Sequence, residues 1–109
     1  MKYSVLTIPP FDKQLKRLAK KFPSLKSEFS TLIQSLEVNP EQGIALGNQC
    51  YKVRLSIASK NKGKSGGARI ITNIVVSDKI VYLLSIYDKS EKESLTDKEL
   101  YELLKMIVS

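Results

Sequence analysis

Histidine is absent from this chain of 109 residues, which also has no tryptophan and a single cysteine, Cys50. Histidine is the usual general base at neutral pH and the commonest zinc ligand. Its absence excludes Ser-His-Asp and Cys-His hydrolases and most metal hydrolases. One cysteine permits no disulfide within the chain, which favours a reducing, cytoplasmic compartment. Any catalysis must therefore use lysine, arginine, tyrosine or carboxylates, and we expect neither a metal nor a cofactor.

Long apolar runs are also absent, because none approaches the ~20 residues that a membrane-spanning helix needs. The apolar run from Tyr3 to Ile8 stops at Pro9-Pro10, too early for a secretory signal. Hydrophobic residues make up 42% of the chain and charged residues 27%, as in ordinary globular proteins. We expect one domain spanning residues 1–109, with no membrane contact.

Acidic residues are missing from one long stretch, because residues 43–76 hold six cations and no Asp or Glu in a chain of net charge +7. Such a field favours a phosphate-bearing or acidic partner, although lysines that only solubilise strand edges would give the same charge. Gly63 to Arg69 reads Gly-Lys-Ser-Gly-Gly-Ala-Arg and begins like the end of a P-loop. A P-loop needs a glycine where Ala58 stands and a helix where a β-branched run follows, so we do not expect ATP or GTP binding here.

The hydrophobic pattern predicts an α+β fold in which an N-terminal helical hairpin packs on a small sheet. The expected elements are a strand over residues 3–8, helices over 11–22 and 25–39, a loop over 41–49, strands over 51–58, 68–76 and 80–87, and a helix over about 97–107. Thr96 and Glu99 form a capping box at the start of the last helix. The strand from Ile80 to Tyr87 is apolar on both faces, which predicts a central position in the sheet.

Strand alternation also predicts which polar side chains share a face. A three-residue turn, Ser77 to Lys79, would pair Arg69 with Tyr87, whereas a two-residue turn would shift that pairing by one. An even-numbered loop before residue 68 would then add Lys52 and Arg54 to the same face. We expect this face to point outward, so that Arg69 supports little of the core and its replacement by alanine leaves the fold intact.

Four cations would gather on this face around Tyr87, namely Lys52, Arg54, Arg69 and Lys89. Each could be an ordinary solvated residue, with Tyr87 a core or rim aromatic. As a group without an acid, however, the cations predict an anion site. The chemistry within their reach is RNA cleavage by the 2′-hydroxyl, in which the protein aligns the nucleophile, stabilises the charged transition state and moves two protons.

The chain resembles the RelE/ParE superfamily of bacterial toxins, and most of all its RelE/HigB-like branch. The resemblance covers nearly all of the chain and depends chiefly on Cys-Tyr-Lys-Val-Arg-Leu (50–55), the glycine-rich segment ending at Arg69, and Leu-Leu-Ser-Ile-Tyr-Asp-Lys-Ser (83–90). It implies a small, mainly antiparallel sheet with two N-terminal helices and a C-terminal helix. It also implies a ribosome-dependent messenger RNA endonuclease that inhibits translation, with a cognate antitoxin and with operator DNA bound only through the antitoxin complex.

The family's basic catalytic and RNA-contacting positions fall on Lys52, Arg54, Arg69 and Lys89. The tyrosine expected in the final segment is replaced by Leu95, so Tyr87 is taken as its substitute. The predicted catalytic residues are thus Arg54, Arg69, Tyr87 and Lys89, and the predicted RNA-backbone contacts are Lys52, Lys60, Lys62 and Lys64. The same fold includes ParE-like toxins that inhibit DNA gyrase without catalysis, which is the alternative function.

Overall fold

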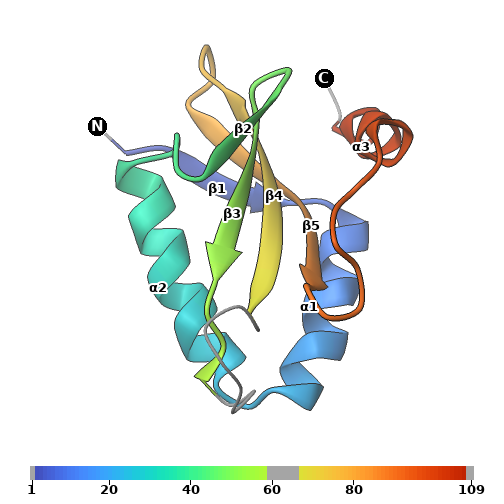
Figure 1. Cartoon of the computed structure of the whole chain (residues 1–109). Coiled ribbons are helices and arrows are strands. Elements are labelled where there is room, and N and C mark those ends of the chain that lie inside the picture. The colour runs from blue at the N-terminus through green and yellow to red at the C-terminus, as the bar shows by residue number, and fades with distance from the viewer. Residues whose placement is uncertain (1, 59–66, 108–109) are drawn as a thin grey trace.

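The computed structural model describes residues 2–58 and 67–107, which form three helices around a five-stranded sheet (Figure 1). The elements are β1 (Ser4–Thr7), α1 (Pro9–Lys21), α2 (Leu25–Val38), β2 (Ile44–Gly47), β3 (Cys50–Leu55), β4 (Ala68–Val75), β5 (Ile80–Asp88) and α3 (Asp97–Leu104). The order of strands across the sheet is β1-β5-β4-β3-β2, and only the β1–β5 pair is parallel. The predicted α+β class and the mainly antiparallel sheet are therefore confirmed.

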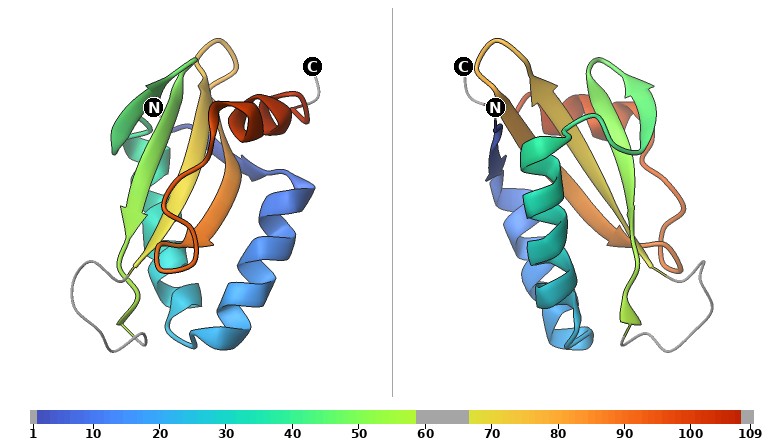
Figure 2. Two further views of the ribbon diagram at one scale, coloured as in Figure 1. Left: turned by 45° about the vertical axis from the view of Figure 1, so that its right-hand side comes forward. Right: turned by 90° about the vertical axis from the view of Figure 1, so that its left-hand side faces the viewer.

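The two faces of the sheet are covered differently (Figure 2). Helices α1 and α2 lie on one face, where fully buried side chains such as Phe11, Leu18 and Leu36 form the main core. Helix α3 lies against the other face and buries Leu100. In the described ranges, none of the helices has the length and apolar character needed to cross a bilayer. The face that carries the predicted cations is thus the one that α3 partly covers.

The ends of the predicted helices are close to those of the structure. Pro9 and Pro10 form the first turn of α1, where a missing backbone N–H costs nothing, so the helix starts two residues earlier than predicted. The capping box of α3 is present, because Thr96 Oγ1 accepts from the Glu99 backbone N–H and Glu99 Oε1 accepts from the Thr96 N–H. That helix ends at Leu104, before the predicted residue 107.

The predicted loop over residues 41–49 is wrong in its middle, because Ile44–Gly47 is the edge strand β2. The alternation of apolar and polar residues could not predict this strand, because all four residues of β2 are exposed and neither of its faces is buried. Gly43 makes the pairing with β3 possible. A β-carbon there would clash with the Lys52 carbonyl oxygen, and Gly43 adopts a φ of +92°, which favours glycine.

The predicted pairing of Arg69 with Tyr87 is confirmed, but the predicted turn is wrong. Val75 pairs with Ile80, so four residues, 76–79, separate the two strands instead of three. An irregularity opposite Ile71 and Thr72 places one extra residue, Leu84, in β5 and restores the expected register beyond it. Strand β5 is paired on both sides, by β1 and β4, as its two apolar faces predicted.

Candidate functional site

Three predicted site residues form one row across β3, β4 and β5, near one end of these strands. Arg54 on β3 pairs with Arg69 on β4, and Arg69 pairs with Tyr87 on β5. Directly paired residues of neighbouring strands point to the same face, and the strands lie about 4.8 Å apart, so the row spans about 10 Å. The sheet, rather than a loop, therefore sets the spacing of these three side chains.

A shallow hollow of about 170 Å³ lies beside this row. Gly43, Ile44, Lys52, Arg54 and Arg69 line it, so that three cations face it without an acid. Within residues 2–58 and 67–107, none of these three cations has a carboxylate within ion-pair distance. Cations that gather without a counter-charge repel one another unless an anion lies between them. We call this hollow the cationic hollow.

Arg69 is buried, contrary to the outward position predicted for it. Its side chain is only 6% exposed, and Nη1 donates to the Ala68 carbonyl oxygen at 3.0 Å. Arg69 is buried because it lies on β4, the central strand, and on the face that α3 and its connector cover. Arg54 lies on the neighbouring strand β3 and is exposed. Arg69 is thus a buried cation, and the expectation that alanine would leave the fold undisturbed loses its basis.

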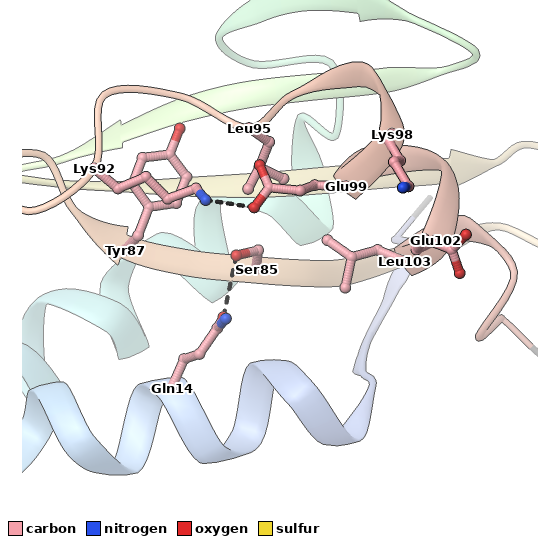
Figure 3. A pocket seen from close by; sticks show the side chains of 9 residues that line it. All are labelled: Gln14, Ser85, Tyr87, Lys92, Leu95, Lys98, Glu99, Glu102 and Leu103. Atoms are coloured by element: carbon pink, nitrogen blue, oxygen red, sulfur yellow. Dashed lines mark hydrogen bonds and ion pairs between the residues drawn. The ribbon is translucent and has the colours of Figure 1, made fainter.

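Tyr87 is equally buried, at 6% exposure, and its hydroxyl has no hydrogen-bond partner in the described part of the chain. Burial raises the pKa of Tyr87 above 10.0, Arg69 opposes that rise, and the nearby Glu99 carboxylate adds to it. Lys92 Nζ also forms an ion pair with Glu99 Oε2 at 2.6 Å, and this pair lies beside the Tyr87 ring (Figure 3). An unpartnered buried hydroxyl is costly, which is typical of a functional group.

Of the other predicted site residues, the structure describes Lys52 and Lys89. Lys52 pairs with Ile71 and lines the cationic hollow, so it lies on the same face as the row, as predicted. Lys89 follows the end of β5, where its backbone N–H donates to the Gly67 carbonyl oxygen at 3.2 Å. It thus lies at the end of the strand that carries Tyr87. Lys60, Lys62 and Lys64 lie outside the described residues.

Sequence reasoning missed the residues that α3 and its connector bring to this face, Lys92, Leu95 and Glu99. The sequence did contain a signal for this arrangement. The apolar stripe of the last helix has to pack against the sheet, and the helical hairpin already covers one face, so the last helix is expected on the other face. Among the described residues, no group of three His, Cys, Asp or Glu side chains could hold a metal ion. The groups that this face presents are cations, the Tyr87 phenol and the Glu99 carboxylate.

Replacement of Gly67 with alanine should destabilise the base of the β3–β4 pair. A β-carbon at Gly67 would clash with the Leu55 carbonyl oxygen, so the two strands must separate just before Arg69. Overpacking of this kind costs about 1–3 kcal/mol, and urea unfolding of the G67A variant should show it as a lower midpoint. An unchanged midpoint would mean that the strands separate freely, and that Gly67 does not fix the position of Arg69.

Comparison with known proteins agrees with this fold. The model of the family described as the RelE toxin of the RelE/RelB toxin–antitoxin system matches residues 11–108. A mutant of the E. coli toxin RelE in the free state superposes with a TM-score of 0.63 at 18% identity, covering 99% of this chain and 100% of that one. A crystal structure of the isolated E. coli RelE toxin gives a TM-score of 0.59 at 15% identity, over 97% and 99% of the two chains. This chain belongs to the RelE family of type II toxins, whose members act with an antitoxin as partner.

Proposed function

We propose that this toxin is a ribosome-dependent endoribonuclease that cuts messenger RNA and so stops translation in the cytoplasm. The observation that carries the proposal is the buried Arg69, which lies between the cationic hollow and the unpartnered Tyr87 hydroxyl. A buried cation without a carboxylate partner is expensive for a fold to keep. A phosphate group placed over it would supply the missing charge.

The proposed reaction uses the substrate's own 2′-hydroxyl as the nucleophile. Its oxygen bonds to the adjacent phosphorus while the bond from phosphorus to the 5′-oxygen breaks, which yields a 2′,3′-cyclic phosphate and a 5′-hydroxyl. Arg54 and Arg69 would stabilise the extra negative charge on the phosphoryl oxygens in the transition state. Lys52 would hold a neighbouring phosphate, and Lys60, Lys62 and Lys64 would contact the RNA backbone.

Two protons must move, and Tyr87 and Lys89 are the groups proposed to move them. Burial keeps the Tyr87 hydroxyl protonated, which suits it to donate a proton to the departing 5′-oxygen. Lys89 then remains to accept the proton of the 2′-hydroxyl. The raised pKa of Tyr87 also makes the phenol a weak acid at neutral pH, so the reaction would be slow until the ribosome holds the messenger in the required geometry.

The alternative function is the ParE-like inhibition of DNA gyrase, in which the toxin binds its target without chemistry. Such a binding protein has no need of a buried arginine beside a phenol, whereas RNA cleavage can use the arginine to stabilise the transition state and the phenol to donate a proton. The cationic hollow therefore favours RNA cleavage.

Brief induction of this toxin in bacterial cells should stop protein synthesis within minutes, and mapping of transcript 5′ ends should show new cuts inside coding regions. We expect the cuts to require translation, because the proposed site depends on the ribosome for substrate alignment. A messenger with its start codon removed is the matched control and should stay intact. Intact messengers together with arrested DNA replication would select gyrase inhibition instead.

A further inference from the structure

A second hollow, of about 340 Å³, lies beside Tyr87 between α1, β5 and α3 (Figure 3). Its lining is Gln14, Ser85, Tyr87, Lys92, Leu95, Lys98, Glu99, Glu102 and Leu103. The charged residues among these are two lysines and two glutamates, which balance. Unlike the cationic hollow, this one has no excess charge for a phosphate, so its chemistry suits a neutral group. We call it the Gln14 hollow.

Gln14 is held in one orientation by the exposed edge of β5. Strand β1 pairs only with Ile80 to Leu83, which leaves the following residues of β5 without a neighbouring strand on that side. The Ile86 backbone N–H donates to Gln14 Oε1 at 3.0 Å, and Ser85 Oγ donates to the same oxygen at 3.1 Å. A backbone N–H can only donate, so the atom that faces it must be the amide oxygen.

The amide nitrogen of Gln14 is therefore open to water or to a ligand, because this side chain is only half-buried. Its Nε2 makes no hydrogen bond to any residue in the described ranges. The apolar part of the lining is formed by the Tyr87 ring, Leu95 and Leu103, whereas Gln14 reaches the hollow from α1 (Figure 3). A ligand that fits must be flat or apolar at its sides and must present a hydrogen-bond acceptor at its edge.

We infer that the Gln14 hollow binds a nucleobase of the messenger, next to the phosphate that the cationic hollow holds. The inference rests on the proposed function, and it assigns Gln14 as a positioning residue that selects the base. Proteins that read single-stranded RNA hold splayed-out bases against aromatic or apolar side chains and bond their edges. The volume is in the range of small-ligand sites, and Tyr87 and its strand neighbour Arg69 connect the two hollows.

The expected selectivity follows from the free donor. If the donor meets position 6 of a purine or position 4 of a pyrimidine, it bonds the carbonyl oxygen of guanine or uracil better than the amino group that adenine or cytosine carries at the same position. At one fixed position next to the cut, transcripts cleaved by the wild-type toxin should therefore be enriched in guanine and uracil.

Gln14→Glu tests this selectivity without removing the structural contact. A carboxylate still accepts from the Ile86 N–H and the Ser85 hydroxyl, but it presents an acceptor to the hollow in place of the donor. Mapping of 5′ ends should then show a shift at that position toward adenine and cytosine. Exchange of one hydrogen bond should change the ratio of guanine and uracil to adenine and cytosine at that position by roughly twofold to tenfold. Gln14→Met offers neither group and should flatten the preference.

Gln34→Glu makes the same chemical change on the exposed part of α2 and should leave the base distribution unaltered. If wild type cuts messengers but Gln14→Glu and Gln14→Met leave the distribution unchanged, the base site is wrong and the proposed function stands. If wild type does not cut at all, the proposed function itself fails. A Gln14→Glu toxin that keeps its base preference but escapes neutralisation by the antitoxin would assign the hollow to a protein partner and overturn the inference.

Discussion

An Arg69→Met toxin should cut transcripts at least about a hundredfold more slowly than wild type, the loss expected when a transition-state donor is removed. In cells this toxin should no longer arrest growth. Arg69 is the only residue that both lines the cationic hollow and pairs with Tyr87 among those that the structure describes. Its removal takes away the charge that the transferred phosphoryl group needs, and no neighbouring lysine has the same place on the central strand.

Methionine is preferred to alanine because Arg69 is buried, at 6% exposure. Alanine would leave a cavity at this buried position and would confuse loss of charge with loss of structure. Methionine fills a similar volume, and apolar replacements of buried charges are often neutral or stabilising, so the midpoint of thermal unfolding should not fall. Arg17→Met is the matched control, because Arg17 is exposed on α1 and Glu91 is its only ion-pair partner among the described residues. Full toxicity of a stably folded Arg69→Met protein would eliminate the proposed site.

Tyr87→Phe should have opposite effects on activity and stability. As the proposed proton donor, the hydroxyl accounts for about a hundredfold or more in rate, so cleavage should fall by that factor. The same hydroxyl is buried without a partner, and its removal should raise the free energy of unfolding by roughly 1 kcal/mol. Urea unfolding of the Tyr87→Phe protein therefore tests the effect on stability, and 5′-end mapping with the same protein tests the effect on cleavage. A variant that loses stability, or one that keeps full activity, contradicts this role for Tyr87.

The pH dependence of stability gives an independent test of Tyr87. Its pKa is raised above 10.0 in the folded protein, so as the pH rises past that value the unfolded chain loses the proton first. The stability of wild type should accordingly fall between pH 10 and the higher folded pKa, and it should be fully present below that range. The Tyr87→Phe variant should lack this loss of stability at high pH, whereas Tyr101→Phe, a change at an exposed tyrosine, should retain it.

The sequence predicted the elements with buried faces well, because period and caps are local properties. The apolar stripes of α1 and α2, the two apolar faces of β5 and the Thr96–Glu99 capping box all gave the right element. Strand β2 was missed because it buries nothing. The pairing of Arg69 with Tyr87 was right although the turn was wrong, since the extra residue at Leu84 compensated for a longer turn.

The sequence by itself determined the fold class and the residue types available for chemistry, and it brought Lys52, Arg54, Arg69 and Tyr87 to one face through strand alternation. Only the tertiary structure decided how buried they are. Helix α3 packs against that face, which excludes water from Arg69 and Tyr87 and brings Lys92 and Glu99 beside the phenol. The physical reason is that alternation fixes a side chain's direction locally, whereas burial depends on contacts between distant segments. The orientation of Gln14 is of the second kind, because the unpaired edge of β5 alone sets it.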